Sequence, residues 1–246
     1  MASHEMLTIQ GLGVSFDGFK AVDDLNFLVD RNELRVVIGP NGAGKTTLLD
    51  LICGKTKSTS GTIVFKNLDL TTMKEHDIVR SGVGRKFQTP SIYENLTVSE
   101  NLEVSFPRGR TAFGALFFKR AADVVDRVHA IAEEVMLSDK LEQQAALLSH
   151  GQKQWLEIGM LLMQDPELLM LDEPVAGMTV NEREQTAELL NRICKNRSVI
   201  VIEHDMEFVR KIAHKVTVLH QGKVIAEGSM DKVTADPRVI EVYLGH

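Results

Sequence analysis

The feature that most constrains this chain is a glycine-rich octapeptide between a β-type segment, residues 35–38, and a helical segment, residues 47–53. It matches the pattern G-x-x-x-x-G-K-[ST] at each fixed position and reads Gly39-Pro40-Asn41-Gly42-Ala43-Gly44-Lys45-Thr46. Glycines let the backbone wrap closely around a polyphosphate, in conformations that a Cβ would obstruct. Successive N–H groups then face the phosphates, and the following helix adds the positive end of its dipole. The octapeptide therefore predicts a phosphate-binding loop.

The last two residues of this loop carry its chemistry. Lys45 is predicted to bring a positive charge to the β- and γ-phosphates, and the Thr46 hydroxyl is predicted to coordinate Mg²⁺. The competing interpretation is a chance glycine-rich turn, which the position between a strand and a helix disfavours. The loop does not distinguish among GTPases, kinases, helicases and transporter ATPases, so later residues must decide the class.

Charge and composition restrict the partners. The net charge of −6 and a pI near 5.8 argue against nucleic acid, because neutralising phosphates requires a basic surface. No apolar run approaches the roughly 18 residues that span a bilayer, and residues 1–6 lack the features of an export signal. Cys53 and Cys194 lack metal-ligand spacing and are expected to be reduced, partly buried thiols. We therefore expect a soluble, cytoplasmic chain that reaches a membrane only through a partner.

Hydrophobic periodicity divides the chain into a β-rich first part, a helical middle and a final part in which strands and helices alternate. The strands are expected at residues 7–14, 24–29, 35–38, 62–65, 168–171, 199–202, 216–220 and 223–226. Gln221-Gly222 is typical of a hairpin turn between the last two strands. The alternation predicts a mainly parallel sheet that is covered on both faces.

The middle part, residues 92–162, looks like a helical lobe inserted into an α/β core made of residues 1–91 and 163–246. One helix face is indicated by apolar residues at helical spacing, namely Ala122, Val125, Val128, Ala132 and Val135. An aromatic cluster in this lobe is expected to be buried or to dock to a partner, and comprises Phe113, Leu116, Phe117 and Phe118.

Two adjacent carboxylates follow the apolar strand at residues 168–171. A buried strand delivers Asp172 to the carboxyl edge of the sheet, where ligands collect in open α/β folds, and there it can hold Mg²⁺. Glu173 is predicted to polarise a water for attack on the γ-phosphate. A surface turn is the alternative for this segment alone, but a phosphate-binding loop needs such a carboxylate.

A second apolar strand, residues 199–202, is followed by Glu203-His204-Asp205. His204 is a candidate to contact the γ-phosphate and sense whether it is present. A single histidine at a strand end is usually structural or merely exposed, so this hypothesis depends on the neighbouring motifs.

The segment that decides the class is Leu148-Ser149-His150-Gly151-Gln152, which enters a helix shortly before the carboxylate strand. Ser149 is a plausible cap of that helix and a ligand for an anion at its positive end. An ordinary helix cap is the alternative, but the order of these motifs is specific. The segment resembles the ABC ATPase signature, usually written Leu-Ser-Gly-Gly-Gln, with His150 in place of the first glycine.

The resemblance covers essentially the whole chain and implies a single ABC ATPase domain. Its fold is α/β, a RecA-like P-loop NTPase core with an antiparallel β subdomain and an inserted helical subdomain. It implies that Gln88 touches Mg²⁺ and the attacking water, and that Glu173, His204 and Lys45 are catalytic. Mg²⁺ would be held by Thr46, Gln88 and Asp172. ATP would contact Phe16 at the adenine, Ala21 and Val22 at the base and ribose, and the residues of the loop and helix start, Gly39, Pro40, Asn41, Gly42, Ala43, Gly44, Lys45, Thr46 and Thr47.

In this family two subunits meet head to tail, so Ser149, Gly151 and Gln152 would act on the nucleotide of the partner. The segment Ala176-Gly177-Met178-Thr179 departs from the family pattern, because many relatives have an Asp where Thr179 stands. Communication between the two sites is therefore expected to differ from the common pattern.

Residues 85–90 and 173–179 look closest to the urea-uptake ATPase within the importer family for branched-chain amino acids and urea. Such a subunit lies on the cytoplasmic face of the inner membrane. The implied partners are two transmembrane permeases, a paralogous ATPase or a second copy of this chain, and indirectly a solute-binding protein. A soluble ABC ATPase of DNA repair or translation is the first alternative, but it usually carries long coiled-coil insertions or two fused cassettes. A nucleotide-binding regulator is the second, and Glu173 and His204 argue against it.

Overall fold

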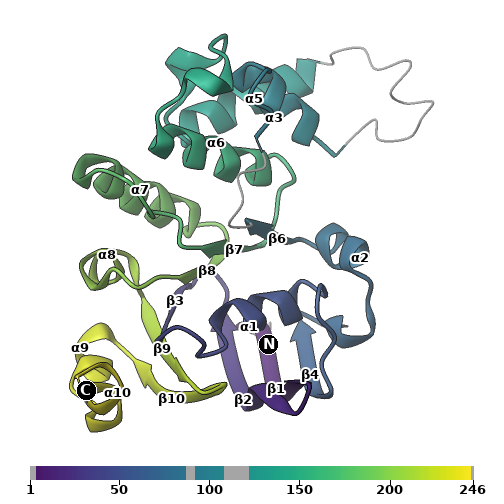
Figure 1. Ribbon diagram of the computed structural model, residues 1–246. Coiled ribbons are helices and arrows are strands. Elements are labelled where there is room, and N and C mark those ends of the chain that lie inside the picture. The colour runs from purple at the N-terminus through teal and green to yellow at the C-terminus, as the bar shows by residue number, and fades with distance from the viewer. Residues whose placement is uncertain (1–3, 87–91, 108–121, 245–246) are drawn as a thin grey trace. The chain divides into compact units, whose positions relative to one another are not determined.

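The computed structural model describes residues 4–86, 92–107 and 122–244 (Figure 1). The chain forms two compact units, each built from segments that are far apart in the sequence. The first unit comprises Met1–Arg85, Glu167–Pro174 and Leu190–His246, and the second comprises Lys86–Pro166 and Val175–Leu189. The helical lobe predicted at residues 92–162 falls within the second unit, while the predicted aromatic cluster lies outside the described residues.

The first unit contains a four-stranded antiparallel sheet with strand order β2-β1-β4-β5. Its strands are β1 (Glu5–Phe16), β2 (Phe19–Asp30), β4 (Ser60–Phe65) and β5 (Leu68–Asp69). β1 and β2 extend beyond the predicted strands because they meet in a tight turn at Asp17-Gly18, where both residues have positive φ. Leu7, Ile9 and Leu12 point into the core and are at most 1% exposed. The strands predicted in this part of the chain are confirmed.

The second sheet of the first unit has the strand order β10-β9-β3-β8-β7-β6. Its strands are β3 (Leu34–Ile38), β6 (Val83–Lys86), β7 (Leu168–Asp172), β8 (Ser198–Ile202), β9 (Lys215–His220) and β10 (Lys223–Gly228). β3 pairs in parallel with β8 and β9, and β7 pairs in parallel with β8, as predicted. The predicted hairpin is also confirmed, because β9 and β10 are antiparallel and Gln221 and Gly222 both have positive φ.

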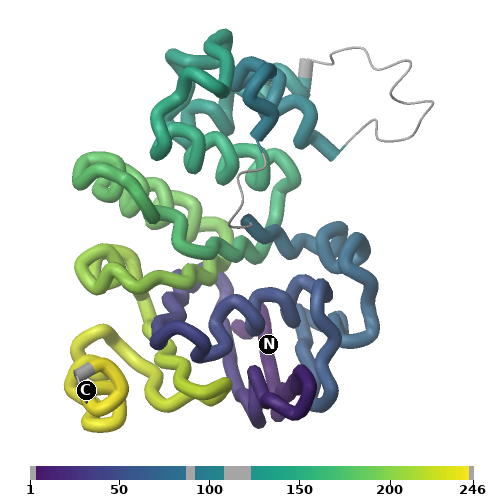
Figure 2. Tube along the Cα trace, in the orientation of Figure 1, coloured from purple at the N-terminus to yellow at the C-terminus, as the bar shows by residue number. Residues whose placement is uncertain are grey.

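This sheet brings the chemistry-bearing segments together. β3, β7 and β8 run parallel, so their carboxyl ends lie at one edge, followed by residues 39–46, Glu173 and Glu203 respectively. β6 and β7 are neighbours in the sheet although the segment that builds most of the second unit lies between them in sequence, as the main-chain trace shows (Figure 2). The sheet thus places both ends of that inserted segment on adjacent strands.

The helices of the first unit follow the strands. They are α1 (Lys45–Ile52), α2 (Glu75–Arg80), α8 (Met206–Ile212), α9 (Met230–Thr234) and α10 (Pro237–Leu244), with a short 3₁₀ helix at Leu70–Thr72. Cys53 caps the end of α1, and the following Gly54 adopts the left-handed conformation typical of a helix end, with φ 78°. Cys53 and Cys194 are both buried and free, and burial raises the pKa of Cys194 to about 12.

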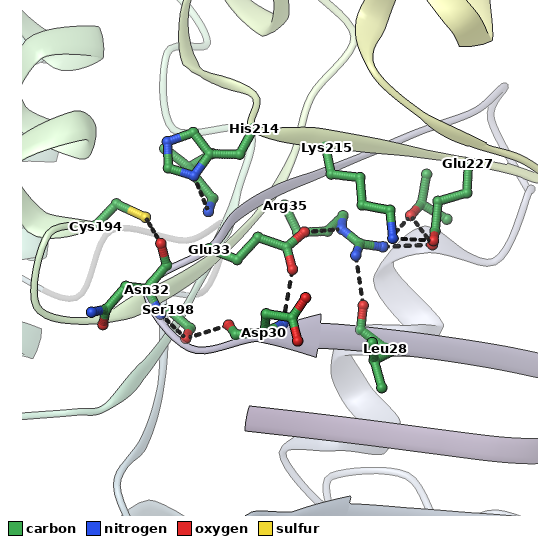
Figure 3. A network of polar contacts seen from close by, with 12 residues as sticks. Leu28, Asp30, Asn32, Glu33, Arg35, Cys194, Ser198, His214, Lys215 and Glu227 are labelled. Carbon is green, nitrogen blue, oxygen red and sulfur yellow. Dashed lines mark hydrogen bonds and ion pairs between the residues drawn. The ribbon is translucent and has the colours of Figure 1, made fainter. Parts of the chain in front are cut away.

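A buried arginine, Arg35, joins the larger sheet to β2 (Figure 3). Its guanidinium is completely buried and donates to four acceptors, namely Glu33 Oε1 at 2.6 Å, Thr217 Oγ1 at 2.8 Å, Glu227 Oε2 at 2.6 Å and the Leu28 carbonyl at 2.6 Å. Because these acceptors come from β2, β9, β10 and the residue just before β3, one side chain connects four segments of the core.

The turn between β2 and β3 is held by the same network (Figure 3). The Ser198 hydroxyl donates to the Asp30 carbonyl at 2.9 Å and accepts from the Asn32 N–H at 3.0 Å. The Asp30 N–H in turn donates to Glu33 Oε2 at 2.8 Å. The entry of the chain into β3, and hence into the loop at residues 39–46, is therefore fixed by the Ser198 side chain of β8 and by Glu33, as well as by the strand ladder.

An Arg35→Met variant is expected to lose about 3–5 kcal/mol of unfolding free energy, because it leaves the buried Glu33 carboxylate without its cation. Chemical denaturation measures this loss. The matched control is Arg31→Met at an exposed position, where we expect a change within about 0.5 kcal/mol. Equal stabilities of the two variants would contradict the structural role assigned to Arg35.

The second unit is helical. It contains α3 (Val98–Ser105), α5 (Ala122–Glu134), α6 (His150–Leu162) and the first part of α7 (Val180–Ile193), with short 3₁₀ helices at Ser138–Lys140 and Ala145–Leu147. The three helices α3, α5 and α6 pack against one another. The predicted apolar face of α5 is confirmed in part: Val128, Ala132 and Val135 are buried, whereas Val125 is only partly buried and its neighbour Val124 is buried instead. Among the described residues, none of the helices combines the length and the apolar character required to cross a bilayer.

Candidate functional site

The loop at residues 39–46 is held by tight backbone packing in the first unit. Gly44 precedes α1 with φ 98°, and a Cβ there would lie 2.6 Å from the Ala21 carbonyl oxygen. A Cβ on Gly39 would lie 2.3 Å from the Leu219 carbonyl oxygen. The Gly222 N–H donates to the Ala43 carbonyl at 3.0 Å, so the β9–β10 turn supports the loop from outside. These two glycines are therefore required by space as well as by conformation.

Lys45 reaches back across this loop. Its Nζ donates to the carbonyls of Gly39 at 2.7 Å and Pro40 at 3.0 Å. Burial lowers the pKa of Lys45, although the nearby carboxylates of Glu173 and Asp172 oppose the shift. The ammonium thus contacts main-chain oxygens of the loop, and a polyanion bound there would favour its charged form.

Thr46 and Asp172 come together although they are 126 residues apart in sequence. The Thr46 hydroxyl donates to Asp172 Oδ2 at 3.2 Å. Asp172 is 3% exposed, and burial raises the pKa of its carboxyl, while the hydrogen bond from Thr46 acts in the opposite direction. A hydroxyl next to a buried carboxylate supplies the oxygen ligands that Mg²⁺ prefers, and a divalent cation would offset the cost of burying the charge. The donor set present therefore fits this metal.

Glu173 directly follows β7, and its backbone turns out of the extended strand conformation into the left-handed region. Its φ is 48°, and its N–H donates to the Ile202 carbonyl of β8 at 3.0 Å. Its Oε1 lies 3.5 Å from His204 Nδ1, so the two predicted catalytic side chains are neighbours. The buried Glu203 accepts from the His204 N–H at 3.0 Å and fixes the backbone there. No role was predicted for Glu203. Its position between an apolar strand and His204 was the sequence signal that could have identified it as a residue that orients the backbone of His204.

The residues predicted at the base and ribose differ in exposure. Phe16 ends β1 and is 48% exposed, so its ring is available to a planar ligand. Ala21 and Val22 are 8% and 1% exposed and belong to the core of the first unit. The base contact therefore remains a proposal for Phe16, whereas Ala21 and Val22 offer almost no side-chain surface to a ligand.

The segment at residues 148–152 lies in the second unit. Ser149 caps α6: its Oγ accepts from the Gln152 N–H at 3.2 Å, and Gln152 Oε1 accepts from the Ser149 N–H at 3.0 Å. Ser149 and His150 are exposed, whereas Gly151 is buried. His150 Nε2 lies 2.9 Å from the Ala176 carbonyl oxygen, so the residue that departs from the usual signature contacts the segment before α7.

A carboxylate that the sequence interpretation missed sits against this segment. Ser149 Oγ donates to Glu182 Oε1 at 2.8 Å, and Thr179 donates to Glu182 Oε2 from both its N–H and its hydroxyl, each at 2.9 Å. The spacing Thr179-Val180-Asn181-Glu182 is a capping-box pattern, which was the signal that could have identified it.

Gln88 lies outside the described residues, so its contacts with Mg²⁺ and water stay a prediction. The neighbouring Lys86 is described and is nearly buried, with its Nζ 3.2 Å from Glu157 Oε2.

The sequence matches two protein-family models and is similar to several known proteins. The family model described as "ABC transporter" matches residues 22–176, and that described as "Branched-chain amino acid ATP-binding cassette transporter" matches residues 223–246. The chain is 35% identical over 252 residues to the high-affinity branched-chain amino acid transport ATP-binding protein LivG of Escherichia coli (strain K12), which covers 99% of both chains. It is 34% identical over 250 residues to the probable LivG of Archaeoglobus fulgidus, covering 98% of this chain and 96% of the relative.

Two solved structures are similar over nearly the full length. A nucleotide-free ATP-binding cassette from an ABC transporter has a TM-score of 0.84 at 31% identity and covers 98% of this chain and 100% of its own. The ADP conformation of the cassette MJ1267 has a TM-score of 0.86 at 32% identity and covers 98% and 99%. The fold is thus similar to that of ATP-binding cassettes of ABC transporters, one of which was solved in its ADP conformation.

Proposed function

This chain belongs to the ABC transporter family, as an ATP-binding subunit of the branched-chain amino acid importer type, and from that premise we propose that it powers solute uptake by hydrolysing ATP at the loop of residues 39–46. The observation that carries the proposal is the contact of Thr46 with Asp172 at the carboxyl edge of the parallel sheet. It joins the end of the phosphate-binding loop to the carboxylate that such a loop requires. Glu173 follows immediately.

The reaction is ATP hydrolysis, and its cofactor is Mg²⁺. Mg²⁺ supplies charge neutralisation at the phosphates, and Thr46 and Asp172 are the described residues that would hold it. We assign Lys45 to the β- and γ-phosphates and Glu173 to the water that attacks the γ-phosphorus, with release of ADP and phosphate. We assign His204 to direct contact with the γ-phosphate, where it would sense whether that group is present, and its position 3.5 Å from Glu173 supports this assignment. Gln88 keeps its predicted role at the metal and the water.

The second half of the ATP site comes from another subunit in this proposal. Ser149, Gly151 and Gln152 begin α6, whose N-terminus favours an anion, and the exposure of Ser149 supports contact with a neighbour. We propose a head-to-tail dimer with a paralogous ATPase or a second copy of this chain. Two transmembrane permeases would hold it at the cytoplasmic face of the membrane and take solute from a solute-binding protein.

The solute is proposed to be urea, on the resemblance of residues 85–90 and 173–179 to urea-uptake ATPases. Branched-chain amino acids are the second candidate, favoured by the names of the relatives at 34% and 35% identity. Both candidates share the same ATP chemistry, because in this family the permeases and the binding protein contact the solute.

The test is the ATPase rate of the intact complex, purified with its permeases and supplied with its solute-binding protein. We expect urea to stimulate ATP turnover several-fold. Amides are tested alongside it as chemically related solutes. Stimulation by leucine, isoleucine or valine in place of urea would assign the second candidate. A turnover rate that responds to none of these solutes would contradict both assignments of the solute.

A further inference from the structure

The hydrogen-bond donors at the start of α6 are already engaged inside the second unit. Ser149 Oγ donates to Glu182 Oε1 at 2.8 Å, and the Gly151 N–H also faces this carboxylate. The packing is close, because a Cβ on Gly151 would lie 2.5 Å from both the Glu182 carboxyl carbon and Oε1. Glu182 therefore lies where an anion bound at this turn would have to lie.

Glu182 is held in this position from its other side by α7. Thr179 donates to Oε2 from its N–H and its hydroxyl, and the Glu182 N–H donates to Thr179 Oγ1 at 3.3 Å. These bonds form a capping box, so one carboxylate serves the starts of both α6 and α7. The backbone N–H of Thr179 lowers the pKa of Glu182, and the hydrogen bonds from Ser149 and Gly151 add to this against the opposing effect of burial. The group is consequently an anion at neutral pH.

One donor cannot serve two anions at once. The Ser149 hydroxyl has a single proton, which it gives to Glu182, while its oxygen already accepts from the Gln152 N–H. A phosphate oxygen that approached this hydroxyl and the Gly151 N–H would find them occupied and would also meet a like charge. Access of a phosphate therefore requires that the Glu182 carboxylate move away.

The surroundings provide room for that movement. An open groove of about 520 Å³ lies beside the turn within the second unit, and its lining includes Gln152, Trp155, Thr179, Glu182 and Gln185. Trp155 is itself fixed, because its Nε1 donates to Thr186 Oγ1 at 2.9 Å. The Glu182 carboxylate thus has open space beside it, into which it could swing without displacing Trp155.

We propose that Glu182 is an internal competitor for the phosphate site at residues 149–152, and that its displacement sets the ATP affinity of the dimer. This inference rests on the proposed function, in which that site receives the triphosphate bound by the partner. A carboxylate on the same donors keeps an isolated subunit capped and raises the ATP concentration at which two subunits associate.

The test measures MgATP-driven association of the full chain by sedimentation equilibrium, with Glu173→Gln in every sample so that ATP persists. Glu182→Gln is compared with the parent. Glutamine is also accepted at this position of a capping box, so α7 stays capped, and circular dichroism verifies the fold. The matched control is Glu188→Gln, an exposed carboxylate further along α7 that removes the same charge.

We expect Glu182→Gln to tighten the ATP-bound dimer about tenfold, equivalent to about 1.4 kcal/mol, because a neutral amide competes less well for charge-stabilising donors. Glu188→Gln should leave the dissociation constant unchanged. A purely structural role predicts the opposite sign, since weakening the cap would weaken association.

Equal or weaker association of Glu182→Gln would overturn the inference while leaving the head-to-tail dimer intact. Equal tightening by Glu188→Gln would overturn it too, because the effect would then be general charge repulsion. If the parent does not associate with MgATP at all, the proposed dimer of two copies fails, and the inference fails with it.

Discussion

The Lys45→Ala variant is expected to lose ATP turnover by a factor of at least about 10²–10³. This is the loss that accompanies removal of one preorganised charge-stabilising group. The physical reason is that the loop offers mostly neutral N–H groups to a highly charged ligand. The Lys45 side chain adds a positive charge to this loop, because its ammonium Nζ lies within 3.0 Å of the Gly39 and Pro40 carbonyl oxygens. The loss should be seen in binding as well as in turnover.

The fold should survive this substitution. Lys45 Nζ donates only to main-chain carbonyls among the hydrogen bonds of the described residues, and its burial lowers its pKa, so truncation relieves a desolvated charge. Phosphate release measures turnover, and calorimetric titration with MgATP measures binding. The matched control is Lys74→Ala, at an exposed position ahead of α2, which should behave as the parent protein. Parent-level turnover in Lys45→Ala would refute the assignment of the loop.

The second large effect is expected for Glu173→Gln, which should slow hydrolysis by about 10²–10⁴-fold while MgATP binding is retained. An amide has nearly the shape of the carboxylate but cannot accept a proton from the attacking water. Glu173 has a positive φ of 48°. Because glutamine differs from glutamate only at the end of the side chain, it can adopt the same backbone conformation, and the position of residue 173 should be preserved. Single-turnover measurements separate the chemical step from binding.

With hydrolysis blocked, ATP should accumulate in a closed dimer. Gel filtration with MgATP, in the presence of the cognate partner subunit, is expected to show a larger dimer fraction for Glu173→Gln than for the parent. Glu241→Gln, on the exposed face of α10, serves as the charge-matched control. A dimer fraction no larger than that of the parent would count against Glu173 as the residue that activates water.

Local rules made much of the fold predictable. The strand–loop–helix succession around residues 39–46, the left-handed end of α1 at Gly54 and the β9–β10 hairpin at Gln221-Gly222 all follow from conformational preferences of a few consecutive residues. The same holds for the position of Asp172 and Glu173 after a buried strand. Periodicity located α5 but misjudged its apolar face by one residue, choosing Val125 where Val124 is buried. Because Val124 and Val125 are adjacent and of the same type, hydrophobic periodicity alone does not specify which of them faces the core.

Long-range neighbours were beyond those rules. Arg35 was part of the expected β-type segment at residues 35–38, and it is the fully buried cation whose guanidinium contacts four segments of the core. Val22 lies among the residues predicted near the base and ribose, and its side chain is 1% exposed, because burial depends on which elements cover the strand. Glu182 had a visible capping-box spacing with Thr179, but nothing in the sequence indicated that Ser149, 33 residues earlier, would share its carboxylate.

Local sequence patterns already identified the residues that could do chemistry: a loop that can cradle phosphates, carboxylates at strand ends and a serine at a helix start. These depend on short-range backbone conformation and on side-chain type, which neighbouring residues specify. Which of these residues contact one another follows from the folded chain, in which Thr46 contacts Asp172 and Ser149 contacts Glu182. Such contacts arise from the pairing of distant strands and the packing of helices. They depend on how the whole core packs, so a pattern of a few consecutive residues does not predict them.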